Sequence, residues 1–112
     1  MEFELQQDNV GLNPVRSFGN PVTMLPITLD FSDVTDYPTG GEEIDLSNYF
    51  NYGDGENVIL LISPKDGYIF EYDNDNEKVK VYEGDGTDGI KEVDNDDDIS
   101  SLEDVHAIAF GY

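Results

Sequence analysis

The sequence is poor in several residue types, and each scarcity excludes a class of protein. It has no cysteine, which excludes disulfides and thiolate metal sites. Only 5 of its 112 residues are Lys or Arg, so it has few cations to neutralise phosphates, and binding to DNA or RNA is not expected. No apolar run approaches the roughly 20 residues that span a bilayer, and Glu2 and Glu4 stand where a signal peptide would be basic. We therefore expect no membrane anchor and no secretion signal.

Carboxylates are the opposite extreme. Asp and Glu number 26, which gives a formal net charge of −21. In dilute buffer charges repel one another over a Debye length of about 10 Å, whereas at about 1 M salt this length falls to about 3 Å. Such a charge is also typical of disordered chains, but here the acids are spread among strand-like segments rather than gathered in one block. The composition therefore favours a folded protein whose surface is adapted to very salty water.

The apolar pattern is that of short strands. Alternation predicts a strand over Val22–Phe31, in which Pro26 requires an edge position or a bulge. The unbroken run Val58–Ile62 predicts a central strand buried on both faces. Residues 68–82 predict a hairpin, and Val105–Tyr112 predicts a last strand. We therefore expect an all-β fold: a small β-sandwich or jelly-roll-like domain, with a partly open barrel as the alternative.

Residues 1–21 differ from the rest because they show little periodicity and contain two prolines and the only arginine. We expect them to form an extended N-terminal arm, followed by a β-sandwich domain over residues 22–112. The Arg16 guanidinium is suited to a bidentate contact with a carboxylate of a partner, and the alternative is a salt bridge inside the chain. The predicted partner-contact residues of the arm are Pro14, Arg16, Phe18 and Pro21.

Candidate chemistry is sparse. Asp94, Asp96 and Asp98 follow the opening spacing of a calcium loop, but Ile99 occupies the position that needs glycine. We therefore expect solvated carboxylates there, with no metal and no other cofactor. His106 is the only histidine, and its position in the last strand favours packing or exposure over proton transfer. The sequence indicates a protein that is not an enzyme.

Several turn and strand motifs resemble those of small structural proteins of tailed viruses, over roughly residues 27–112. They are turns and aromatic strands, so the likeness bears on fold more than on any site, and the expected arm is not covered by it. The motifs are Tyr37–Glu42 (YPTGGE), Ser63–Asp73 (SPKDGYIFEYD), Lys78–Tyr82 (KVKVY), Glu92-Val93, Asp98–Ser100 and the ending Ala109–Tyr112 (AFGY).

The resemblance implies a virion component that decorates and stabilises the outside of an icosahedral head. Its partner would be the major capsid protein, and it would act as a homo-oligomer, a trimer first and a pentamer second. With the acidic composition, the host would be a halophilic archaeon, in whose cytoplasm the particle is assembled.

Two other functions remain open from the residues alone. The first is a free-standing ligand-binding β module for calcium or carbohydrate. The second is an acidic mimic of DNA that inhibits a DNA-binding protein, which requires negative charges at the spacing of phosphates.

Overall fold

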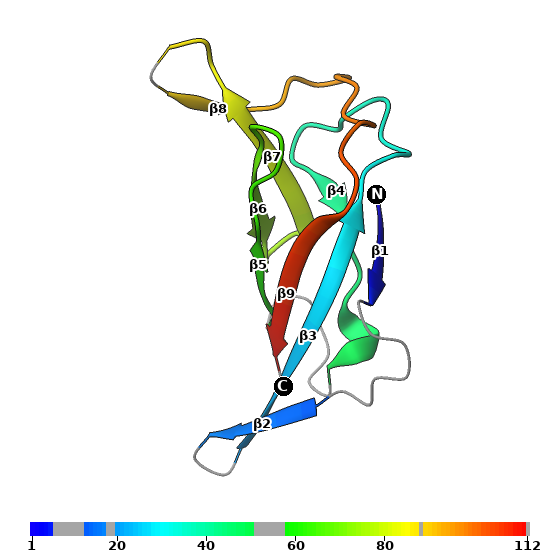
Figure 1. Ribbon diagram of the computed structural model, residues 1–112, viewed down its shortest axis with the longest axis vertical. Coiled ribbons are helices and arrows are strands. Elements are labelled where there is room, and N and C mark those ends of the chain that lie inside the picture. Colours follow the sequence, from blue (N-terminus) through cyan, green and yellow to red (C-terminus); the bar gives the residue numbers. More distant parts are fainter. Residues whose placement is uncertain (6–12, 18–19, 51–57, 88, 112) are drawn as a thin grey trace.

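The protein folds into two antiparallel β-sheets that face each other, as in a small β-sandwich (Figure 1). The computed structural model describes residues 1–5, 13–17, 20–50, 58–87 and 89–111, with the backbone alone for 13–17 and 20–22. The predicted all-β class is confirmed, since the described part contains no α-helix and one short 3-10 helix, η1 (Ser47–Tyr49). The jelly-roll form stays a prediction.

The five-stranded sheet joins the start of the chain to its end. Its order is β1-β3-β9-β5, and β2 also pairs with β3. Every pairing in it is antiparallel. Its strands are β1 (Glu2–Leu5), β2 (Asn13–Ser17), β3 (Asn20–Asp30), β5 (Ile59–Ile62) and β9 (Val105–Gly111).

The long strand β3 is the spine of this sheet. On one side it pairs with β9 without interruption, from Thr23↔Gly111 to Leu29↔Val105. On its other side, β2 pairs with residues 20–24 and β1 with residues 27–30, so residues 25 and 26 have no pairing partner there. Proline has no N–H to donate to a ladder, and Pro26 lies in this gap. The sequence predicted that Pro26 needs an edge position or a bulge. The gap between β1 and β2 provides an edge position at this residue.

The four-stranded sheet contains the predicted hairpin. β6 and β7 pair from Ile69↔Tyr82 to Asp73↔Lys78, which confirms it. In its turn, the Asp73 carboxylate accepts hydrogen bonds from the backbone N–H of Asp75 (3.1 Å) and of Asn76 (3.3 Å). The strands are β4 (Glu42–Glu43), β6 (Ile69–Asp73), β7 (Lys78–Gly84) and β8 (Ile90–Glu92), in the order β4-β7-β6 with β8 also on β7.

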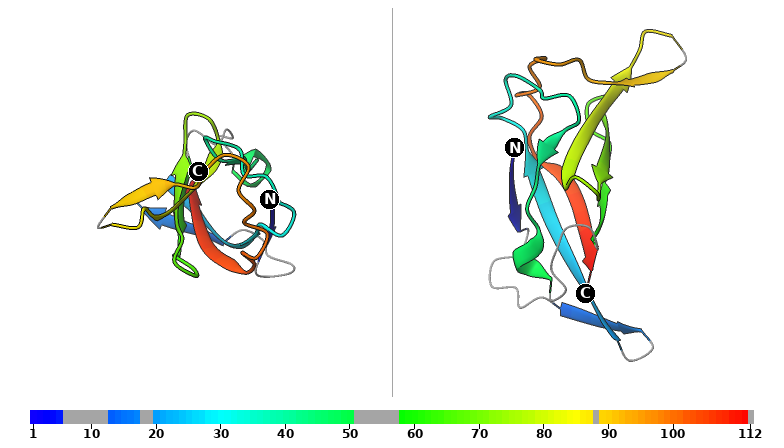
Figure 2. Two further views of the ribbon diagram at one scale, coloured as in Figure 1. Left: turned by 90° about the horizontal axis from the view of Figure 1, so that it is seen from above. Right: turned by 180° about the vertical axis from the view of Figure 1, so that it is seen from behind.

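The core lies between the two sheets, which enclose it when the molecule is seen from above (Figure 2). Phe31 at the end of β3 stacks on Phe70 of β6, with 5.5 Å between ring centroids. Ile27 and Leu29 of one sheet and Val81 of the other are fully buried. Burial of such side chains contributes about 1.5–3 kcal/mol each, so these contacts dominate the stability of the fold.

The first strand corrects the expected arm. Glu2–Leu5 pairs with β3 from Glu2↔Asp30 to Leu5↔Ile27, and Phe3 packs against the core. The alternation of apolar and acidic residues in this segment is only five residues long, which is why it was not recognised as a strand. The expected boundary between residues 21 and 22 was also wrong, because it falls inside β3.

A second correction concerns the run Val58–Ile62. It was expected in the centre of a sheet, but β5 stands last in the order of the five-stranded sheet. Val58 and Leu60 are buried, whereas Ile59 and Leu61 are each 60% exposed. Only one face of this strand is therefore covered by the rest of the described chain.

Candidate functional site

The outer side of the five-stranded sheet carries a cluster of exposed apolar side chains. In β9, Ala107 and Ala109 point into the core, so Ile108 between them points outward. The register sets Leu61 opposite Ile108, and Ile59 opposite Phe110. Met24 and Pro26 of β3 lie opposite Phe110 and Ile108 from the other side of β9. We call this cluster the apolar face; it consists of Met24, Pro26, Ile59, Leu61, Ile108 and Phe110.

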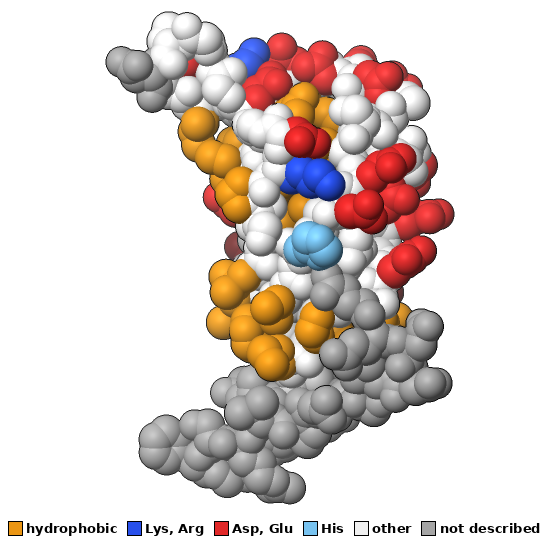
Figure 3. All heavy atoms as spheres, viewed as in Figure 1, with side chains coloured by type: hydrophobic (Ala, Val, Ile, Leu, Met, Phe, Trp, Pro, Cys, Tyr) orange, Lys and Arg blue, Asp and Glu red, His pale blue; other side chains and the backbone are white. Residues whose placement is uncertain are grey.

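Four residues of the apolar face are exposed, whereas Pro26 and Phe110 are half-buried. On the other sheet, Ile69 and Ile90 are exposed as well. Ile59 and Leu61 are each 60% exposed, Met24 39% and Ile108 38%. Hydrophobic side chains gather visibly over the lower part of β9 and its neighbours (Figure 3). Scattered apolar residues are normal on a protein surface, but a contiguous group marks a contact surface.

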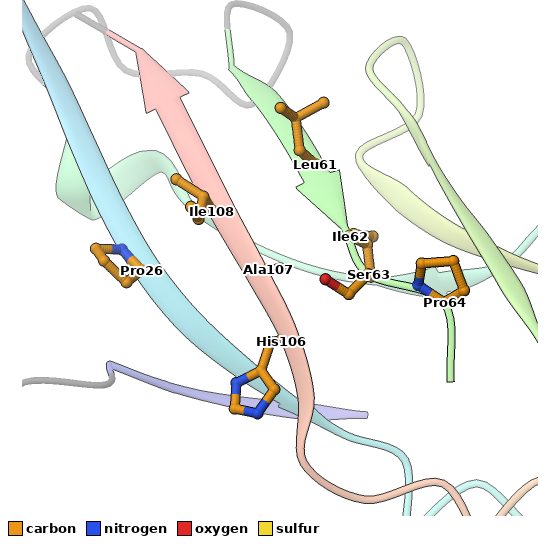
Figure 4. Close-up of a pocket in the computed structure, with 8 residues that line it drawn as sticks. All are labelled: Pro26, Leu61, Ile62, Ser63, Pro64, His106, Ala107 and Ile108. Atoms are coloured by element: carbon orange, nitrogen blue, oxygen red, sulfur yellow. The ribbon is translucent and has the colours of Figure 1, made fainter. Parts of the chain in front are cut away.

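A shallow hollow of about 690 Å³ adjoins this face (Figure 4). It lies between β3, β9 and the end of β5, and Pro26, Leu61, Pro64 and Ile108 supply much of its wall. Ser63 and His106 are its only polar lining side chains in the described part of the chain. One hydroxyl and one imidazole on an open surface give little means to orient a polar substrate, so the hollow favours apolar contact over catalysis.

No carboxylate belongs to the apolar face. The acids on the outer side of this sheet are grouped over β1, where Glu2 is opposite Asp30 and Glu4 is opposite Thr28. Thr28 is in turn opposite His106 of β9. The space-filling view shows acidic side chains along the right-hand edge and few over the apolar cluster (Figure 3). Thr28 and His106 thus lie between the apolar face and the nearest acids of its own sheet.

The buried tyrosine of the YPTGGE turn lies where a loop meets the four-stranded sheet. The Tyr37 hydroxyl donates a hydrogen bond to Glu92 Oε2 (2.7 Å) and accepts one from the Val81 N–H (3.1 Å). The same carboxylate oxygen accepts the Gly40 N–H at 2.8 Å. Burial and the bond to Glu92 raise the pKa of Tyr37 well above its usual range. The side chain stays protonated with its hydroxyl fully used, which fits an anchor between loop and sheet.

The backbone around Tyr37 ties down the acidic loop at Asp94–Asp98. The Tyr37 N–H donates to the Asp97 carbonyl (2.9 Å), and the Asp96 N–H donates to the Tyr37 carbonyl (2.8 Å). Hydrogen bonds from Ser100 to Asp98 lower the pKa of that carboxyl. Lys91 pairs with Asp94 at 3.2 Å. Across the described residues, no three His, Asp or Glu side chains converge as a metal site requires.

Three of the four predicted contact residues lie on β2 and the start of β3, at one end of the molecule (Figure 1). β2 carries Pro14, opposite Thr23, and Arg16, opposite Pro21 of β3. Phe18 lies outside the described residues. The hairpin of β2 and β3 begins where Asn13 is opposite Met24, so its backbone continues directly from the apolar face. The structure thus brings the backbones of three of the four predicted residues together. Their side chains are not among the parts of the chain that it describes.

The apolar face itself was missed by sequence reasoning. Its signal was the run Val58–Ile62, which has apolar residues at outward as well as inward positions. We took that run as evidence of burial on both sides. The alternation in β9 gave a second signal, because Ile108 and Phe110 share a side with His106.

Comparisons with protein-family models, with curated proteins and with solved structures return no match. Among the residues described, no helix is long and apolar enough to cross a membrane. The assignment of function therefore depends on this chain's own residues.

Proposed function

We propose that this protein is a non-catalytic structural subunit of a virion, which decorates and stabilises the outside of an icosahedral capsid of a tailed virus. The observation that carries the proposal is the division of the surface between an uncharged apolar face and an acid-rich remainder. This division suits a protein that works through contact surfaces. The motifs YPTGGE and SPKDGYIFEYD resemble those of virion structural proteins. This resemblance is the reason for proposing a virion as the assembly.

The elongated shape supports one orientation on the capsid. The principal extents are 47 × 26 × 21 Å, with the β2–β3 hairpin at one end and the loop of β8 at the other (Figure 1). In the proposal, the hairpin with Arg16 contacts the major capsid protein, where a guanidinium binds a carboxylate bidentately. The Asp94–Asp98 loop then faces solvent.

The charge of the chain supports a salt-rich setting. The exposed area of 6733 Å² carries a net charge of −21, roughly one negative charge per 300 Å². At the few-molar salt of a halophilic cytoplasm, the Debye length is about 3 Å or less, and repulsion between these charges is largely screened. The proposed host is accordingly a halophilic archaeon.

A particle-binding experiment tests the proposal. Virions prepared without the gene for this chain are mixed with the purified protein in about 3 M KCl, where charge repulsion is screened, and sedimented. The wild type is expected to sediment with the particles. Arg16→Gln is expected to lose at least about tenfold in binding, since a charge-assisted contact contributes about 1.5–3 kcal/mol.

The matched control is Lys91→Gln, which removes a cation near the opposite end of the molecule. Lys91 is paired with Asp94 and lies on β8, so its loss is expected to leave particle binding unchanged. Wild-type protein that stays in the supernatant at every salt concentration would sink the proposal. Equal losses for the two variants would show that the hairpin is not the contact.

A further inference from the structure

We infer that the apolar face is an interface between two copies of this chain, packed face to face about a two-fold axis. The inference adds a partner surface to the proposed function and stands without it. The exposed area, the shape of the hollow, the positions of the carboxylates and the effect of salt all favour a second copy as the occupant of this face.

The exposed area is that of the centre of a dimer interface and not of a whole one. The exposed fractions of Met24, Ile59, Leu61 and Ile108 together amount to about two whole side chains, on the order of 300 Å², since each is smaller than an aromatic side chain. A standard interface buries about 800 Å² per partner and surrounds its apolar core with a polar rim, which would supply the remainder. Thr28 and His106 border the face and supply part of such a rim.

The shape of the face permits self-complementarity. Leu61 is largely exposed on β5, and the hollow between β5, β9 and β3 lies directly beside it (Figure 4). A two-fold interface uses the same patch on both subunits, so each must offer a protruding group and a recess that receives it. In the proposed dimer, Leu61 of each copy enters the hollow of the other copy, so the same contact is made twice.

The carboxylates explain why the occupant is a second copy. Each chain carries a net charge of −21, so two copies repel one another wherever acids meet. The apolar face has no acid, and the acids of its sheet lie over β1. A two-fold axis running along β9 places the two β1 strands on opposite sides of the dimer. A basic partner would instead be attracted to the carboxylates, and the apolar face has no charge to recognise it.

Salt gives the inference a distinctive signature. Added salt screens the repulsion between the two acidic bodies and also strengthens burial of apolar surface. Dimerisation is therefore expected to tighten as KCl rises. Contact with a basic partner would weaken under the same change, because its attraction is screened.

Sedimentation velocity of the purified full chain at about 0.1 M and about 3 M KCl tests the inference. The wild type is expected to sediment as a dimer, twice the 12.5 kDa chain, at high salt and to dissociate at low salt. Leu61→Asn is expected to weaken association at least tenfold. Ile90→Asn is the matched control: Ile90 is also 60% exposed but lies on β8, outside the face, and its replacement is expected to leave the dimer intact. Thermal unfolding of each variant verifies that it is folded.

Three results overturn the inference. The first is wild-type protein that stays monomeric at every salt concentration, and the second is an equal loss of association in Leu61→Asn and Ile90→Asn. The third is a mass of three or five chains, which would favour the trimer or pentamer expected from the sequence over a two-fold contact. Particle binding separates this inference from the proposed function. A protein that dimerises but does not sediment with virions would contradict only the proposed function. A monomeric protein whose binding to virions is lost in Leu61→Asn would contradict only the dimer.

Discussion

The outer sides of the two sheets differ although the fold makes the same demand on both. Each sheet must bury every second residue, and neither demand specifies the residues that point away from the core. On the four-stranded sheet two of the three outward pairs between β6 and β7 are charged, Glu71 with Lys80 and Asp73 with Lys78, and the third is Ile69 with Tyr82. On the five-stranded sheet they pair Leu61 with Ile108 and Ile59 with Phe110. The described residues do not bury this second set of side chains, and the proposed contact between two copies would do so.

The two sheets also differ in the contacts that other parts of the chain make with them. Around the four-stranded sheet, loops return onto the strands, as Tyr37 does through Glu92 and Val81. Lys80 forms an ion pair with Asp73 at 3.8 Å within the same sheet. The apolar face receives no such cover from the described residues. Substitutions in the first region should therefore change the stability of the chain, and those in the second should change its association.

The largest loss of stability is expected from Gly41→Ala. A Cβ on Gly41 would lie 2.5 Å from the Val79 carbonyl oxygen, and its φ of +104° is a conformation that favours glycine. We expect the free energy of unfolding to fall by about 3 kcal/mol, measured by urea unfolding followed by circular dichroism. Gly40→Ala is the control, because Gly40 has a similar φ of +97° but open space around its Cβ position. It should lose only about 1 kcal/mol. Similar losses in both variants would contradict the role of the Val79 contact.

An intermediate effect is expected from Tyr37→Phe. The ring still fills its fully buried site, but the Glu92 and Val81 hydrogen bonds are lost. We expect the free energy of unfolding to fall by about 2 kcal/mol at neutral pH. The same urea titration measures it, and an unchanged value would show that the hydroxyl does not anchor the loop.

The pH dependence of this variant sharpens the test. In the unfolded chain Tyr37 ionises near its ordinary pKa of 10.0, whereas the folded chain holds the proton to higher pH. Above pH 10 the folded state therefore binds more protons, and the wild type loses stability by up to about 1.4 kcal/mol per pH unit through this residue. Tyr37→Phe lacks this titration, so the difference between the two proteins should shrink as pH rises above 10. A constant difference would contradict burial of the hydroxyl.

The smallest effect on stability is expected on the apolar face. Because Leu61 is already 60% exposed, Leu61→Asn should change the free energy of unfolding of the monomer by less than about 0.5 kcal/mol. Its neighbour Leu60 is only 7% exposed, and Leu60→Asn should lose about 2–3 kcal/mol through a cavity and a buried amide. Urea unfolding at concentrations where the chain is monomeric measures both. If Leu61→Asn also unfolded the monomer, the apolar face would belong to the core.

Local patterns predicted the hairpin and the strands around it because their causes lie within a few residues. Tyr72 and Val81 lie in alternating strands, and the Asp73–Asn76 turn uses residues that tolerate unusual backbone angles. In the structure the positive φ of this turn, +55°, falls on Glu77, one residue beyond the predicted turn. Period-2 alternation thus predicted that each of these segments is a strand.

Sequence pattern could not predict the features that depend on distant pairing. Whether Val58–Ile62 lies in the middle or at the end of a sheet depends on the strands that pair with it, and no local pattern encodes that order. The short strand β1 is likewise stabilised by its pairing with β3 and by the burial of Phe3. The apolar face could not be predicted for the same reason, since it combines residues of β3, β5 and β9 that become neighbours only when these strands pair.

The ladder between β3 and β9 also constrains the time course of folding. Its partners, such as Leu29 and Val105, are about 80 residues apart in the chain, and contacts of this kind slow folding because a long loop must close before they form. The hairpin of β6 and β7, whose partners are close in sequence, has no such delay. During synthesis, the five-stranded sheet must therefore wait for the last strand to leave the ribosome. Until then Ile27 and Leu29 lack their neighbours on β9, and their apolar side chains are open to contact with other unfolded chains.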